Sequence, residues 1–143
     1  MQIPNYIILW LANFLSDRTQ LMRVRNSLSE LAEVKSGVPQ GSVLSPLLFI
    51  IYINDIYKLP ISSNILSFAD DTKLMNLSKN FKLLQRDLIF IQEWCDKNNL
   101  FINIEKTVVM HFGHDNFDAF YTINNSKLNV VSEVKDLGLL VDN

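Results

Sequence analysis

Apolar residues recur with helical spacing in three stretches of the chain. Residues 5–15 are mostly apolar, and residues 46–57 are apolar nearly all round. A third stretch covers about residues 79–97, where the apolar positions follow helical spacing: Leu84, Leu88, Ile91 and Cys95. We predict a helix in each stretch, and we expect the middle one to be buried because it has no polar face.

Capping and turn residues place the boundaries of these helices. Ser45 is the predicted N-cap of the middle helix, with Pro46 at its first position, where the missing N–H of proline costs nothing. Ser78 is the predicted cap of the third helix, and Asn98-Asn99 end it. The segment 37–41 contains two glycines and a proline, which predicts a loop.

Short alternating runs predict strands elsewhere. Residues 20–25 alternate polar and apolar, and residues 31–35 can return antiparallel after a turn at Asn26-Ser27. Residues 65–69 and 72–77 are predicted to form strands on either side of Asp70-Asp71, and four further strands are expected at 100–104, 107–112, 120–123 and 135–141. The mixed order of strands and helices predicts an α+β fold.

Composition and charge narrow the class of protein. The chain has 143 residues, 48% hydrophobic and 20% charged, which favours one folded domain or part of one. Its longest apolar run, residues 47–53, is far shorter than the roughly 20 residues of a membrane helix. The start of the chain lacks the basic segment of a signal peptide, so we expect an intracellular protein, nuclear or cytoplasmic and not secreted. The formal charge of −2 argues against an autonomous nucleic-acid binder, because such proteins are usually basic.

The adjacent carboxylates Asp70-Asp71 are the strongest candidate for chemistry. The run before them, residues 65–69, is mostly apolar, so the pair is predicted to lie at the edge of a buried element. Two like charges in such a place favour neutralisation by cations, and hard oxygen ligands suit Mg²⁺ or Mn²⁺. An isolated Asp-Asp doublet is more often a solvated turn, so the surrounding pattern has to decide between these alternatives.

That surrounding pattern resembles a known family. Phe68-Ala69-Asp70-Asp71 resembles the aromatic-x-Asp-Asp motif of reverse transcriptases, and residues 36–49, with Pro39-Gln40-Gly41, resemble the Pro-Gln-Gly stretch of non-LTR (LINE-type) retrotransposon enzymes. Residues 52–56 and 14–20 also match the pattern of these elements. Six residues resemble the polymerase motif D region: Trp94, Asn98, Leu100, Asn103, Lys106 and Thr107. Asp136-Leu137-Gly138 resembles motif E, the primer grip.

The resemblance implies a fold and a set of partners. It implies that residues 1–143 are a partial right-hand polymerase palm, an antiparallel sheet with packed helices, with the fingers and thumb largely absent. The implied activity is RNA-directed DNA polymerisation, in which a primer 3′ hydroxyl attacks the α-phosphate of a deoxynucleotide on an RNA template. The implied cofactor is a pair of Mg²⁺ or Mn²⁺ ions. The sequence indicates no oligomeric state.

The resemblance also assigns roles to individual residues. Asp70 would be a metal ligand and Asp71 would support it, directly or through neighbouring contacts. Phe68 would pack beside the primer end, while Gln40 and Gly41 would lie near the incoming nucleotide and template. Lys106 would protonate or stabilise the pyrophosphate, with an exposed loop lysine as the alternative. Leu137 and Gly138 would belong to the primer grip.

One half of the implied metal site is not found in the sequence. The family's palm uses a further aspartate from an earlier strand, motif A, and the context of Asp17 does not match it. We therefore expect a two-ion site that is incomplete in this chain, a polymerase fragment that is inactive alone, and exposed apolar surface with a tendency to aggregate. The alternative is a non-catalytic RNA- or protein-binding remnant of a decayed element. An RNA-dependent RNA polymerase is disfavoured by Pro39-Gln40-Gly41 together with Phe68-Ala69.

Other conspicuous side chains are expected to serve structure. Trp94 and Cys95 are predicted to pack in the interior. His111 and His114 are expected to be surface or hairpin residues, because no third ligand stands at a useful spacing. The arginines at positions 18, 23 and 25 either contact phosphate or lie on a solvated hairpin face.

Overall fold

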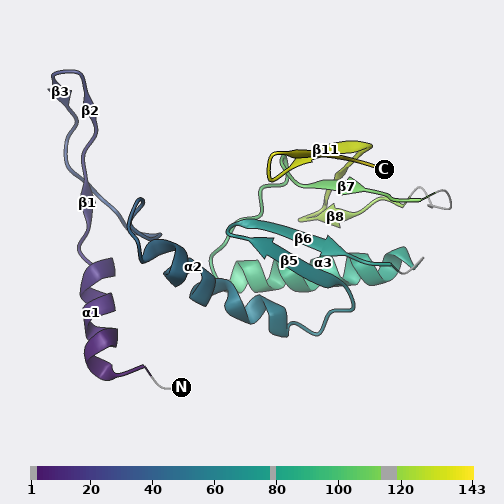
Figure 1. The fold of residues 1–143 in the computed structure, drawn as a ribbon, viewed down its shortest axis with the longest axis horizontal. Coiled ribbons are helices and arrows are strands. Elements are labelled where there is room, and N and C mark those ends of the chain that lie inside the picture. Colours follow the sequence, from purple (N-terminus) through teal and green to yellow (C-terminus); the bar gives the residue numbers. More distant parts are fainter. Residues whose placement is uncertain (1–2, 78–79, 114–118) are drawn as a thin grey trace. The chain divides into compact units, whose positions relative to one another are not determined.

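A computed structural model describes residues 3–77, 80–113 and 119–143 of the chain (Figure 1). The chain divides into two compact units, residues 1–53 and residues 54–143. No helix among the described residues is both long enough and apolar enough to cross a membrane.

The first unit begins with helix α1, Asn5–Leu15, at the predicted bounds. Strand β1, Thr19–Gln20, pairs antiparallel with β4, Ala32–Glu33. The predicted strand 20–25 is interrupted, because β2, Arg23–Val24, forms its own hairpin with β3, Ser27–Leu28. The turn of this hairpin contains residues 25 and 26, one position earlier than predicted.

Helix α2, Ser45–Ile53, differs from the prediction in its start and in its surroundings. The carbonyl of Leu44 accepts the first helical hydrogen bond, from the Leu48 N–H at 2.9 Å, so Ser45 lies inside the helix and is not its cap. The Ser45 hydroxyl instead donates to the Pro39 carbonyl.

The expected burial of α2 is wrong for this chain. Four of its large side chains are about half exposed: Leu47, Ile50, Ile51 and Tyr52. An apolar helix needs neighbours on every side, and the chain buries only Ser45 and Ile53. The predicted exposure of apolar surface is thereby confirmed.

The second unit begins where α2 tightens into a 3₁₀ helix, η1, Asn54–Lys58, so the predicted helical path to residue 57 changes type at Asn54. Strands β5, Asn64–Phe68, and β6, Asp71–Met75, form an antiparallel hairpin. Helix α3, Phe81–Lys97, ends at Asn98-Asn99 as predicted, with Asn99 in a left-handed conformation, φ +52°.

The start of α3 is capped by Asn80. Its side chain accepts a hydrogen bond from the Lys82 N–H at 3.1 Å, which satisfies one of the free N–H groups of the first turn. The helix therefore begins two residues later than expected. The predicted cap Ser78 lies outside the described residues, as does Lys79.

The remaining strands are short and pair two by two. Strand β7, Val108–Met110, runs parallel to β10, Asn129–Val131. Strand β8, Thr122–Ile123, forms an antiparallel hairpin with β9, Ser126–Lys127. Strand β11, Glu133–Asp136, forms another with β12, Leu139–Asp142. The mixed helix and strand content is confirmed, with small and mostly antiparallel sheets among the described residues.

Two strand predictions are wrong. The predicted strand 100–104 is irregular, because the Asn103 carbonyl accepts from the Lys106 and Thr107 N–H groups and turns the chain. The predicted strand 135–141 is a hairpin, because Leu137 and Gly138 take positive φ values of 46° and 89° at a two-residue turn. In both places apolar residues surround a turn, and their pattern resembles that of a continuous strand.

The core of this unit forms where α3 meets the β8–β9 hairpin. The buried side chains of Tyr121, Ile123 and Leu128 pack with half-buried Leu84 and Leu88 of the helix. A second buried face of α3 consists of Asp87, Ile91, Trp94 and Cys95. The helix therefore has contacts on two faces, which makes it the central element of this unit.

Candidate active site

Asp70 lies at the tip of the β5–β6 hairpin. The strand register pairs Phe68 with Asp71, which leaves Ala69 and Asp70 as a two-residue turn. Both carboxylates are exposed. This is the tight bend that the aromatic-x-Asp-Asp pattern predicts, and Asp70 is exposed at the end of the two strands.

The backbone of this turn is strained at Ala69. Its φ is +52°, a left-handed conformation that costs a residue with a Cβ about 1–2 kcal/mol. Asp70 does not share the positive φ, and a hairpin turn with positive φ at its first central position normally has glycine there. Strain of this kind is found at functional sites, where the surrounding structure holds the backbone in place.

The surroundings of the carboxylates differ from the prediction. Leu66 and Phe68, which were expected in a buried element, are 53% and 65% exposed. Ile65 and Leu74, a cross-strand pair on the opposite face of the hairpin, are half-buried. The hairpin therefore has one exposed and one half-buried face. Because the carboxylates are exposed, burial within this chain does not require cations to neutralise their charge. The chemical suitability of their oxygens for Mg²⁺ or Mn²⁺ is unchanged.

An ion pair connects this hairpin to the predicted primer grip. Lys73 of β6 pairs through its Nζ with the Asp136 carboxylate at the end of β11, and both side chains are about one-third exposed. Asp136 directly precedes the turn of Leu137 and Gly138. Because Lys73 and Asp71 are two residues apart on one strand, they share a face of the hairpin. The structure thus brings together the Asp-Asp hairpin and the Leu137-Gly138 hairpin.

The other predicted site residues belong to neither of these hairpins. Lys106 is exposed in the turn 104–106, and the described residues provide no contact between its side chain and either carboxylate. Its backbone N–H donates to the Asn103 side chain at 3.1 Å. Gln40 and Gly41 belong to the unit of residues 1–53, whereas the Asp-Asp hairpin belongs to the unit of residues 54–143.

The loop that contains Gln40 is held by an arginine. Arg18 donates from Nε to the Leu15 carbonyl at 2.9 Å and from its terminal nitrogen to the carbonyls of Ser36 and Gly37. Arg18 therefore links the end of α1 to the loop, a third role beside the two alternatives that the sequence left open. Gly41 has φ +79° with open space where a Cβ would be, so its backbone angle explains the glycine.

The carboxylates of Asp70 and Asp71 do not form a metal-binding group with other side chains among the described residues. Asp70 and Asp71 supply oxygen ligands of the right kind, but no group of three or more His, Cys, Asp or Glu side chains in the described ranges could hold an ion. The half-buried His111 contacts the Ala119 carbonyl through Nε2 at 3.2 Å. His114 lies outside the described residues.

Several interactions of α3 side chains could not be predicted from the sequence pattern. Trp94 is buried as predicted, and its Nε1 donates to the Asp55 carboxylate at 3.1 Å. Cys95 is also buried as predicted, and burial, with a smaller effect from the charge of Asp96, raises the pKa of its thiol. Asp87 is fully buried and is bonded to a loop some 25 residues earlier. Helical spacing could have indicated that Asp87 faces the same way as Ile91, but not what it contacts.

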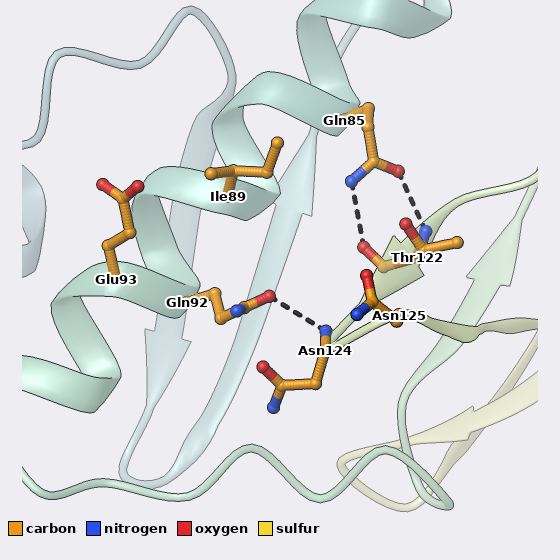
Figure 2. Close-up of a pocket in the computed structure, with 7 residues that line it drawn as sticks. All are labelled: Gln85, Ile89, Gln92, Glu93, Thr122, Asn124 and Asn125. Atoms are coloured by element: carbon orange, nitrogen blue, oxygen red, sulfur yellow. Dashed lines mark hydrogen bonds between the residues drawn. The ribbon is translucent and has the colours of Figure 1, made fainter.

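A pocket of about 420 Å³ lies where α3 meets the β8–β9 hairpin. Its lining residues are drawn in Figure 2. The Gln85 amide makes two hydrogen bonds of 2.9 Å with the backbone of Thr122, and Gln92 accepts from the Asn124 N–H at the same distance. None of the predicted site residues lines the pocket. The Gln85 and Gln92 amides thus attach the β8–β9 hairpin to α3, which is a structural role.

Comparison with known proteins identifies the family. The sequence profile described as "Reverse transcriptase (RNA-dependent DNA polymerase)" matches residues 1–141. The chain is 35% identical over 109 residues to the probable RNA-directed DNA polymerase from transposon BS of Drosophila melanogaster, an alignment that covers 68% of this chain and 12% of that protein. It is 31% identical over 122 residues to the RNA-directed DNA polymerase from the mobile element jockey of the same species, covering 78% of this chain and 13% of the relative.

A jockey polymerase of Drosophila funebris is 33% identical over 126 residues, covering 80% of this chain and 14% of that protein. The chain thus spans less than one-sixth of the length of these curated relatives. No solved structure matches it significantly. From the profile match, the mobile-element relatives and the Asp-Asp hairpin, we conclude that the chain belongs to the reverse transcriptase family, in the non-LTR (LINE-type) retrotransposon group.

Proposed function

We propose that this chain is the part of a polymerase palm that contributes Asp70 and Asp71 to templated DNA synthesis on RNA. The observation that supports this proposal is the place of Asp70 at an exposed two-residue turn, between strands that are paired through to Phe68 and Asp71. A paired hairpin holds a carboxylate at a defined point while leaving it accessible to large substrates. A nucleic-acid end and a nucleotide both need such access.

In this proposal Asp70 is the principal ligand and Asp71 supports it. Mg²⁺ or Mn²⁺ bound there would make the primer 3′ hydroxyl a better nucleophile and stabilise the leaving pyrophosphate. A further carboxylate, from outside the described residues, would complete the ligand set. The role of the chain itself is to hold the two carboxylates at the end of a paired hairpin, so that little reorganisation is needed when substrates bind.

The substrate-facing roles follow from the exposed residues around the hairpin. The ring of Phe68, 65% exposed beside Asp71, offers a flat apolar surface for the primer end. Leu137 and Gly138 would contact the primer, and the Lys73–Asp136 ion pair supports their place near the carboxylates. Gln40, Gly41 and Lys106 would meet the nucleotide, the template and the pyrophosphate. The proposed partners are an RNA template, a DNA primer and deoxynucleotides.

Primer extension tests this proposal. The chain alone, and the same chain preceded by the upstream part of its reading frame, would be assayed on an RNA template with a DNA primer and Mg²⁺ or Mn²⁺. We expect extension only from the longer protein. Asp70→Asn in the longer protein should lower the rate at least a hundredfold, the order of effect seen when a group that stabilises a transition state is removed.

Asp96→Asn is the matched control, because it makes the same chemical change at an exposed carboxylate of α3. It should leave the rate of extension unchanged. Extension that survives Asp70→Asn would refute the role of this hairpin. Extension by the isolated chain that depends on Asp70 would show instead that no external carboxylate is needed.

A further inference from the structure

The side chain of Asp87 is fully buried and yet carries a carboxylate. Its Oδ2 accepts four hydrogen bonds, from the N–H and the hydroxyl of Ser62, both at 2.9 Å, and from the N–H and the hydroxyl of Ser63 at 2.8 and 2.7 Å. The guanidinium of Arg86 donates to Oδ1 at 3.2 Å. Every oxygen of the buried charge is therefore satisfied, as a buried charge requires.

The loop that Asp87 holds leads directly into the Asp-Asp hairpin. Ser62 and Ser63 immediately precede β5, which begins at Asn64. On the other strand, Asn76 follows β6 and donates through its side chain to the Ser63 hydroxyl at 2.9 Å. The two strands of the hairpin are thus connected at their base through Ser63, and Ser63 is bonded to Asp87 of α3.

This contact has consequences at the other end of the hairpin. Five paired residues of β5 separate the base from the turn at Asp70, a length of about 17 Å. A two-stranded hairpin is marginally stable by itself in water, so the direction of its tip depends on what holds its base. Burial alone raises the pKa of the Asp87 carboxyl, but the hydrogen bonds from Ser63, Ser62 and Arg86 outweigh it, so that the pKa lies below its usual range. The carboxylate therefore stays charged and bonded at neutral pH.

We propose that Asp87 is a positioning residue for the Asp-Asp hairpin. It bonds Ser62 and Ser63 to α3 and thereby determines the position of Asp70 and Asp71 at the other end of β5 and β6. The proposal rests on the proposed function of the hairpin. Its structural half, the restraint of β5–β6 by Asp87, can be measured without any polymerase activity.

Amide hydrogen exchange in the intact chain measures the restraint. The first variant is Asp87→Asn, which keeps the shape of the side chain but removes the charge and one acceptor. The second is Ser62→Ala, which removes one hydroxyl at an exposed position and so changes little packing. The conservative rescue is Ser62→Thr, and the matched control is Asp96→Asn on the exposed face of the same helix.

We expect Ser62→Ala to speed exchange in β5 and β6 about tenfold, the factor for losing one hydrogen bond to a buried charge. Asp87→Asn should speed it more. Ser62→Thr and Asp96→Asn should match the parent chain. Exchange at Tyr121, Ile123 and Leu128 in the core should stay unchanged in Ser62→Ala, because the hydrophobic residues that pack against them all come from outside the loop.

Three results would overturn the proposal: a Ser62→Ala chain with unchanged exchange in the hairpin, equal loss of protection in hairpin and core, or a Ser62→Thr chain that behaves like Ser62→Ala. Should Asp87→Asn fail to fold, the Ser62 pair decides by itself. In the longer, active protein, Ser62→Ala should lower kcat while KM for the nucleotide stays the same. If Asp70→Asn leaves extension intact, the proposed function fails while the exchange experiment still tests the restraint.

Discussion

Replacing Ala69 by glycine should stabilise the second unit of the chain, although glycine usually weakens a folded protein. Ala69 has φ +52° at the first position of the hairpin turn, next to Asp70. Its methyl group is exposed, so its removal costs little in packing. Two backbone effects remain. Relief of the left-handed conformation contributes about 1–2 kcal/mol, and the greater freedom of glycine in the unfolded chain costs about 0.5–1 kcal/mol.

Taken at the lower end of both ranges, the difference is a net stabilisation of about 0.5 kcal/mol. For a unit of residues 54–143 this corresponds to a rise in Tm of about 2–4 °C. Thermal unfolding followed by circular dichroism measures the change, and hydrogen exchange at Asp71 and Thr72 shows whether it arises in the hairpin. Ala69→Val should lower Tm instead, because a β-branched residue fits a positive φ worse than alanine does.

Ala32→Gly is the control for the chemical change itself. Ala32 is exposed on strand β4 and has no positive φ, so glycine relieves no backbone strain there. It should weaken the strand by about 0.5–1 kcal/mol. Opposite signs at positions 69 and 32 are the expected outcome. A loss of stability at position 69 as large as that at position 32 would refute a strained turn beside Asp70.

Three further results are expected. Lys73→Glu should destabilise the contact between the two hairpins by about 1 kcal/mol or less, because the ion pair is partly exposed. Adding Asp136→Lys should restore the contact. A double variant no more stable than the single variant would exclude a specific ion pair. Because the pKa of Asp87 is lowered by folding, its stabilising effect is complete above the unfolded pKa near 4 and is lost as pH falls through the folded pKa. Denaturant unfolding between pH 7 and pH 3 should show the beginning of this loss in the parent chain, and an equal loss in Asp87→Asn would contradict it. Polar substitution of Leu47 and Ile50, which are 53% and 55% exposed, should reduce self-association in light scattering, whereas unchanged association would point to another surface.

Local spacing determined much of the secondary structure. The apolar run of α1 predicted both of its ends, and the spacing of Leu84, Leu88 and Ile91 predicted α3. The two runs on either side of Asp70-Asp71 predicted a tight hairpin with the carboxylates at its tip. These features depend on interactions between residues close in sequence, so the order of residue types is sufficient to indicate them.

The same local reasoning failed where a turn lies inside an apolar run. Leu137 and Gly138 interrupt residues 135–141, and Asn103 turns the segment 100–104. Leucine is not a turn residue, and its positive φ of 46° is imposed by the pairing of β11 with β12. Neither turn changes the apolar pattern enough to be recognised without the partner strand.

Only the tertiary structure decided which distant side chains meet. The sequence contains Lys73 and Asp136, Asp87 and Ser62, and Trp94 and Asp55, but their spacings carry no signal that pairs them. The sequence likewise left the burial of α2 open, because an apolar helix is buried only if other elements cover it. Residue order thus specified where the carboxylates of the hairpin would lie along the chain, and long-range contacts determined what holds that hairpin in place.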